Sequence, residues 1–66
     1  MKNRIEEIRK SKGIQQEEFA REMGVSRQTV ISLEKGRYNP SLELAMDIAR
    51  ELDASVYDLF FFSDDE

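Results

Sequence analysis

The sequence predicts an all-α domain, and three observations support this fold class. Apolar residues recur at helical spacing in several segments, as in residues 16–23. Gly24 and Ser26 then interrupt the pattern with the residue types that end one helix and cap the next. Ser55, with Asp58 three residues later, has the spacing of a capping box at the start of another helix. The 66 residues allow one small domain with a modest core.

The first helix is expected to begin at Asn3, a good capping residue, and to end at residues 12–13. Its apolar stripe carries Arg9, and a charged side chain is expected there only if it is paired. Glu34, at the edge of the core side of a later helix, is the predicted partner. The alternative is that both charges are solvated separately, since isolated surface pairs are weak.

Residues 16–35 form the central unit of the chain. A helix over residues 16–23 is followed by a three-residue turn and by a second helix that begins after Ser26. Val25 before this cap and Val30 after it sit where a hydrophobic staple forms and fixes the angle of the second helix. Two helices joined in this way describe a helix-turn-helix.

The second helix of this unit has two different sides. At about 100° per residue, Val30 and Leu33 fall on the side expected to face a core. Arg, Gln and Ser side chains can bond to base edges in the major groove of DNA, and Ile can contact a thymine methyl group. We expect such base contacts from the opposite side, although an ordinary solvated helix face is the alternative. That side carries Arg27, Gln28, Ile31, Ser32 and Lys35.

A loop rich in hydrogen-bond donors follows Gly36. Lys35, Arg37, Tyr38 and Asn39 can all donate to DNA phosphates. Asn39 with Pro40 fits ordinary turn chemistry equally well. Ser41 is then expected to cap a fourth helix whose core face comprises Leu42, Leu44, Ala45, Ile48, Ala49 and Leu52.

Composition argues against several functions. The chain has no Cys and no His, so it lacks thiolate ligands and the commonest general base. No motif places an acid–base pair, and we expect no enzyme activity, no metal or cofactor, and no small-molecule ligand. No apolar run approaches the ~20 residues that a membrane span needs, and no signal peptide precedes the first helix, so a cytoplasmic location is expected.

Charge is divided unevenly along the chain. The net charge is −4, but residues 1–40 hold nine Lys/Arg and six Asp/Glu, whereas residues 41–66 hold one Arg and eight acids. The basic part coincides with the helix-turn-helix. This asymmetry would orient the molecule on a duplex, with weaker non-specific binding than a uniformly basic protein shows.

Four motifs carry a resemblance to a known family: Q-x-x-x-A-x-x-x-G-V-S, S-R-Q-T, L-E-K-G and N-P-S-L. The chain from about Ile5 to Leu59 resembles the Cro/phage-repressor-type helix-turn-helix family, the xenobiotic-response-element class of small prokaryotic and phage transcription regulators. The resemblance implies a compact five-helix, lambda-repressor-like domain that binds double-stranded operator DNA as a homodimer.

The resemblance also assigns roles to individual residues. It implies that Gln16 and the loop after residue 36 contact the sugar-phosphate backbone, and that Arg9 pairs with Glu34. Gln15 departs from the family, whose members usually have Ser or Thr at this N-cap position. Because Gln caps poorly, the start of the second helix should be weakened.

The end of the chain is aromatic and then acidic. We expect a DNA-binding domain over residues 1–62 and an acidic tail over residues 63–66. Three consecutive aromatic residues cannot all face so small a core, and an exposed apolar patch usually marks an interface. The predicted dimer interface is therefore Phe60, Phe61 and Phe62, with packing of one or two of them under the first helix as the alternative.

Two functional classes remain open from the residues alone. The leading one is a sequence-specific DNA-binding regulator, most simply a homodimeric repressor. The other is a protein-interaction module, such as an antitoxin or adaptor, that binds through the acidic second half and the aromatic tail. Only the first explains the polar side of the helix over residues 27–35 together with the donor-rich loop after it.

Overall fold

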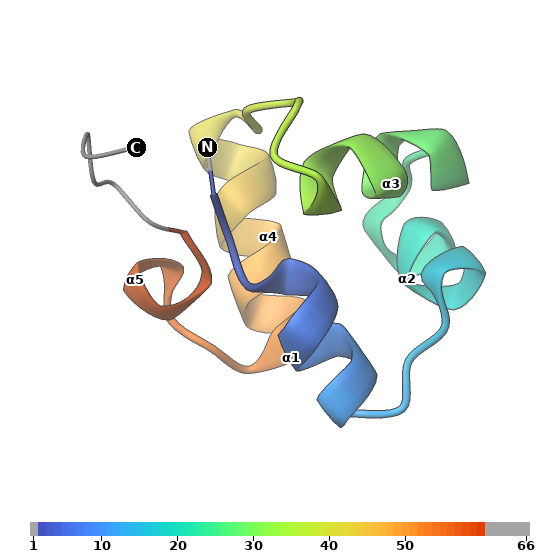
Figure 1. Ribbon diagram of the computed structural model, residues 1–66, viewed down its shortest axis with the longest axis horizontal. Helices are drawn as coiled ribbons and strands as arrows, with labels where there is room; N and C mark the ends of the chain where they lie inside the picture. The colour runs from blue at the N-terminus through green and yellow to red at the C-terminus, as the bar shows by residue number, and fades with distance from the viewer. Residues whose placement is uncertain (1, 61–66) are drawn as a thin grey trace.

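The computed structural model describes residues 2–60, which form five helices and no strand. The all-α, five-helix fold expected from the sequence is confirmed. None of the helices formed by these residues has the length and apolar character needed to cross a membrane. The helices are α1 (Ile5–Ser11), α2 (Gln16–Met23), α3 (Arg27–Glu34), α4 (Leu42–Leu52) and α5 (Val56–Leu59) (Figure 1).

The helices surround one hydrophobic core. Figure 1 shows α2 and α3 on one side of α1 and α4, with α5 on the opposite side. Each fully buried large side chain contributes roughly 1.5–3 kcal/mol relative to its exposed state. All five helices supply buried hydrophobic residues, which are Ile5, Phe19, Ala20, Val30, Leu33, Ala45, Ile48, Leu52, Leu59 and, just after α5, Phe60.

The chain after α5 returns to the N-terminal segment and closes the core. The Arg4 amide donates to the Leu59 carbonyl at 2.7 Å, and Asn3 forms an isolated antiparallel bridge with Phe60. Phe60 is only 3% exposed. Phe60 therefore follows the alternative expected from the sequence, packing within its own domain, and its buried ring offers no surface to the predicted dimer interface. Phe61 and Phe62 lie outside the described residues.

Hydroxyl side chains cap three of the helices as expected. The Oγ atoms of Ser26, Ser41 and Ser55 each accept a hydrogen bond from the backbone amide three residues later, at 3.0–3.2 Å. Gln15, by contrast, makes no side-chain capping bond at the start of α2. The departure of Gln15 from the family pattern thus leaves α2 without this stabilisation.

Asn3 was expected to cap the first helix, but its side chain instead bonds to both α1 and α3. Its Oδ1 accepts from the Ile5 amide at 3.1 Å, and its Nδ2 donates to the Leu33 carbonyl at 2.8 Å. Arg4, rather than Asn3, occupies the N-cap position of α1. Asn3 therefore joins the start of α1 to the last turn of α3, which helps fix how α3 is presented.

The core face of α4 differs from the expected pattern at one residue, Leu42. Ala45, Ile48 and Leu52 are buried, but Leu42 is 74% exposed. Leu42 was expected on the core face, yet it begins the first turn of α4, at the margin of the core. Met46, one turn further along, is 52% exposed. The first turns of α4 thus leave apolar surface uncovered.

Candidate nucleic-acid interface

The turn between α2 and α3 has the geometry expected of a helix-turn-helix. Gly24 ends α2 in the left-handed conformation, with φ 72°, and the amide of Val25 donates to the Ala20 carbonyl at 3.0 Å. Glycine adopts this conformation without the penalty that a side chain brings. Val25 packs against the core and Ala20 is buried. These contacts fix the direction in which α3 leaves the turn.

The two sides of α3 are divided as the sequence predicts. Val30 and Leu33 are buried in the core. Arg27 and Gln28 are exposed in the first turn of α3. The predicted base contacts further along the helix, Ile31 and Ser32, are half-buried, and Lys35 is exposed at its end.

One hollow unites the polar side of α3 with the loop after it. Its volume is about 440 Å³, and it brings predicted base contacts together with predicted phosphate contacts. Tyr38 is 46% exposed, so its ring leaves apolar surface beside these polar groups. The lining residues are Ser26, Gln28, Thr29, Ser32, Arg37 and Tyr38.

Thr29 was not singled out from the sequence. Its hydroxyl lies 2.9 Å from that of Ser26, and its amide donates to the same Ser26 oxygen at 3.1 Å. These bonds place Thr29 at the edge of the hollow beside Gln28. The signal available in the sequence was the capping position of Ser26, which specifies a partner three residues later.

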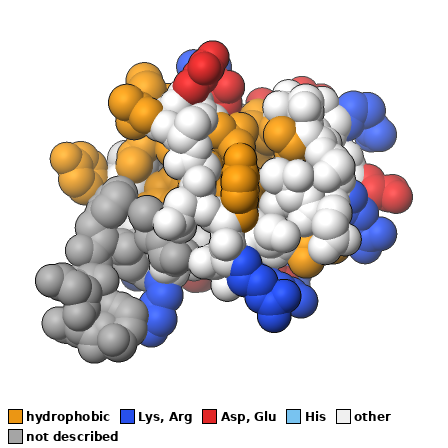
Figure 2. Space-filling model, turned by 90° about the horizontal axis from the view of Figure 1, so that it is seen from above, with side chains coloured by type: hydrophobic (Ala, Val, Ile, Leu, Met, Phe, Trp, Pro, Cys, Tyr) orange, Lys and Arg blue, Asp and Glu red, His pale blue; other side chains and the backbone are white. Residues whose placement is uncertain are grey.

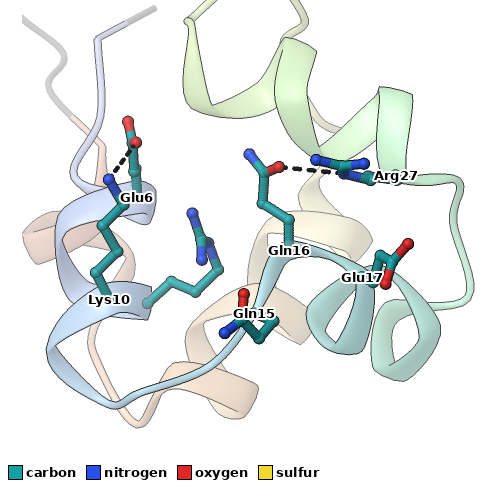
Figure 3. A pocket seen from close by; sticks show the side chains of 7 residues that line it. Glu6, Lys10, Gln15, Gln16, Glu17 and Arg27 are labelled. Atoms are coloured by element: carbon teal, nitrogen blue, oxygen red, sulfur yellow. Dashed lines mark hydrogen bonds and ion pairs between the residues drawn. The ribbon is translucent and has the colours of Figure 1, made fainter.

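A second hollow, of about 500 Å³, lies where α1 meets the starts of α2 and α3 (Figure 3). It brings Gln16 and Arg27 together, although eleven positions separate them in the sequence. The side chain of Gln16 points toward that of Arg27 (Figure 3). The lining residues are Glu6, Arg9, Lys10, Gln15, Gln16, Glu17 and Arg27.

Lys10 is a cation in this hollow that the sequence analysis missed. Its Nζ lies 2.9 Å from Oε2 of Glu6, and this hydrogen bond, followed by the charge of Lys10, lowers the pKa of Glu6. Both side chains are largely exposed. Lys10 was missed because its neighbourhood depends on how α1 packs beside the start of α2, which the spacing of residues within α1 does not reveal.

The pair expected between Arg9 and Glu34 is present. Arg9 Nε lies 2.6 Å from Glu34 Oε2, and the side chains are only 5% and 3% exposed. Arg9 Nη1 also donates to the carbonyl of Ile14 at 2.7 Å. The pair therefore joins α1 to the end of α3 and holds the α1–α2 connection.

Gln16 extends this pair toward the surface. Its Nε2 donates to Glu34 Oε1 at 3.0 Å, while its Oε1 accepts from Arg27 Nε at 3.3 Å. A side-chain amide nitrogen carries two hydrogens, so one remains for the phosphate contact expected of Gln16. The remaining predicted contacts, Ile31, Lys35 and Asn39, line neither hollow.

The fold and this surface define a helix-turn-helix regulator of transcription that binds DNA. A family model described as Helix-turn-helix matches residues 5–59. The chain belongs to this family, in the class that also contains the Cro-type regulators, as the motifs indicated.

Three similar proteins agree with this assignment. An "Uncharacterized HTH-type transcriptional regulator" from Archaeoglobus fulgidus is 53% identical, covering 100% of this chain and 94% of that protein. The "Uncharacterized HTH-type transcriptional regulator YgzD" from Bacillus subtilis is 40% identical, covering 98% of each chain. Among solved structures, the restriction-modification controller protein C.AhdI from Aeromonas hydrophila matches with a TM-score of 0.77, 37% identity and 86% coverage of both chains.

Proposed function

We propose that this protein is a sequence-specific repressor that binds operator DNA as a homodimer, with α3 of each copy in the major groove. The observation that carries this proposal is that α3 has one side buried in the core and one exposed polar side. Val30 and Leu33 are buried, whereas Arg27 and Gln28 project from the first turn on the exposed side. Recognition helices of this kind contact base edges with their N-terminal residues.

The residues of α3 divide into distinct reading roles. An Arg side chain can pair with guanine through two bonds, Gln with adenine, and Ser with either base. Arg27 and Gln28 are therefore the proposed specific readers, and Ser32 adds a contact one turn later. Ile31 offers an apolar surface to a thymine methyl group.

The loop and the ends of the helices supply backbone contacts. Phosphate contacts fix the register of a protein on DNA without reading its sequence. Arg37 and Tyr38 share the hollow with Gln28, so they can meet the backbone that borders the bases Gln28 reads. The proposed set is Gln16, Lys35, Arg37, Tyr38 and Asn39.

A second copy is needed because one short α3 reads only a few base pairs. Helix-turn-helix dimers place their two recognition helices about 34 Å apart, one turn of DNA. The longest dimension of the molecule is 32 Å, and α3 and α5 lie toward opposite ends of that axis (Figure 1). Two copies can therefore meet on the α4–α5 side while α3 of each copy stays free to enter the major groove.

The α4–α5 side also offers apolar surface for such pairing. Leu42, Met46 and Tyr57 are 74%, 52% and 85% exposed. Hydrophobic side chains gather in the left half of the view in Figure 2, the half that contains α4 and α5 in Figure 1. We propose these three residues as dimer contacts, and Phe61 and Phe62 remain predicted contacts. Repression follows if an occupied operator excludes other proteins from the same DNA.

Selection of bound sequences from a random pool of DNA duplexes tests the proposal. Wild type should enrich a two-fold symmetric site whose half-sites are centred about 10 base pairs apart. A reporter with that site across its promoter should be silenced by the protein. No enriched sequence would contradict specific recognition, a single unrepeated half-site would contradict the homodimer, and a stimulated reporter would contradict repression.

A further inference from the structure

The carboxylate of Glu34 has two tasks in the structure. Oε2 pairs with Arg9 Nε at 2.6 Å, whereas Oε1 accepts from both Arg9 Nη2 at 3.3 Å and Gln16 Nε2 at 3.0 Å. With its side chain only 3% exposed, Glu34 is shielded from competing water. We propose that Glu34 is a positioning residue for DNA reading, which acts on Arg27 through the amide of Gln16.

The first step concerns the orientation of the Gln16 amide. A side-chain amide can present either its oxygen or its nitrogen to a neighbour, and its partners decide which. The Glu34 carboxylate only accepts hydrogen bonds, so it selects the orientation in which Nε2 faces inward. A reversed amide would place an oxygen against the carboxylate. Glu34 thereby directs the Gln16 oxygen outward.

The second step concerns Arg27. The outward oxygen of Gln16 accepts from Arg27 Nε at 3.3 Å. An exposed Arg side chain has many conformations, and this contact restricts them through Nε while leaving the two terminal nitrogens for a bidentate contact with guanine. The buried carboxylate of Glu34 thus restricts the side chain of Arg27 before DNA binds. This step rests on the proposed function, in which Arg27 reads a base.

Two substitutions test this relay, which is the chain of hydrogen bonds from Glu34 through Gln16 to Arg27. They differ in their effect on the fold. Gln16→Met removes the relay but leaves the Arg9–Glu34 pair intact. Glu34→Gln keeps the size of the side chain, and its amide oxygen should stay with Arg9. The introduced nitrogen then faces Gln16, which must reverse its own amide, so that Arg27 loses its acceptor.

A compensating substitution separates positioning from stability. In the double variant Glu34→Gln with Gln16→Glu, the carboxylate at position 16 can accept from both the amide at position 34 and Arg27. The formal net charge equals that of wild type. This variant restores the acceptor for Arg27 without restoring the original ion pair, so recovery of reading would not follow from stability alone.

The measurement is discrimination among the four base pairs at the operator position that Arg27 reads. Duplexes carrying each base pair compete for the wild type and each folded variant, below its melting temperature. Gln16→Met and Glu34→Gln should each lower this discrimination by about tenfold, a part of what a bidentate contact provides. The double variant should recover most of it. Discrimination at the position read by Gln28 should stay as in wild type.

Two controls make each outcome decisive. Gln15→Met, an exposed neighbour outside the proposed DNA contacts, should keep full discrimination. Arg27→Ala should abolish it, and failure to do so would overturn the base-reading role itself. If Arg27→Ala abolishes discrimination while Gln16→Met and Glu34→Gln retain it, the proposed function stands and the positioning role is wrong.

Nitrogen-15 spectra without DNA should show the Arg27 Nε signal shifted in Glu34→Gln, and an unchanged signal would also contradict the relay.

Discussion

The Nε atom of Arg9 lies 2.6 Å from Oε2 of Glu34, and this contact joins α1 to the end of α3. Both side chains are nearly buried, so the pair differs from the exposed pairs Glu6–Lys10 and Asp47–Arg50. Exposed pairs contribute little to stability, whereas loss of one partner from a buried pair leaves the other charge desolvated. The orientation of α3 on the core therefore depends on both members of the Arg9–Glu34 pair.

Removal of either member should destabilise the fold. Arg9→Met and Glu34→Leu should each lower the free energy of unfolding by about 3–5 kcal/mol, because each leaves one uncompensated charge. The double variant should lose less than the sum of the two, since no charge is then left unpaired. Urea denaturation of the four proteins measures this cycle. Additive losses would show that the two residues are not coupled.

A residue that caps α2 at position 15 should stabilise the fold. Gln15 makes no capping bond, so Gln15→Ser should raise the free energy of unfolding by about 0.5–2 kcal/mol, the usual range for a cap. Gln15→Ala supplies no hydroxyl and serves as the control. Thermal melts of the three proteins give the comparison. Equal stability of the Ser and Ala variants would mean that no cap forms at this position.

Arg37 should act on all DNA sequences alike. Arg37→Ala should weaken binding uniformly and reduce the slope of log affinity against log salt by roughly one, as expected for one lost phosphate contact. Arg21→Ala, an exposed cation on α2 outside the proposed contacts, is the matched control. Binding titrations across a range of salt concentrations measure the slope. Sequence-dependent loss in Arg37→Ala would assign Arg37 to base reading instead.

The dimer surface can be located by comparison of two double variants. Leu42→Ser with Met46→Ser should shift sedimentation toward the monomer, because both side chains offer exposed apolar surface on α4. Phe61→Ser with Phe62→Ser tests the other predicted contact. Raised salt should strengthen the wild-type dimer by screening its acidic second halves. A monomeric wild type would contradict the dimer, and a fully dimeric Leu42/Met46 variant would exclude α4 as its contact.

Local features of the fold could be predicted from the sequence. Gly24 and Ser26 act through their own backbone and their near neighbours, so residue type and spacing were sufficient to identify the turn. Arg9 was predicted to be paired because a charge on an apolar stripe needs a partner. The division of α3 into a core side and an exposed side followed from helical periodicity.

Other features depend on where distant segments meet. The burial of Phe60 arises from its pairing with Asn3, and the periodicity of α5 contains no trace of that contact. The position of Lys10 in the same hollow as Gln16 depends on the packing of α1. Leu42 fits the periodicity of α4 yet is exposed, because it is the first residue of the helix and lies at the margin of the core. Such contacts are tertiary, and residue spacing within one helix does not encode them.

Base reading by the first turn of α3 is the central claim, and a competition measurement with Arg27→Ala tests it most directly. Duplexes that carry each single base-pair substitution in the operator compete for wild type and for the variant. Arg27→Ala should lose roughly 1–3 kcal/mol of discrimination at one position in each half-site and retain it elsewhere. A preference profile identical to that of wild type would contradict the claim that Arg27 contacts a base and, with it, the assignment of α3 as the recognition helix.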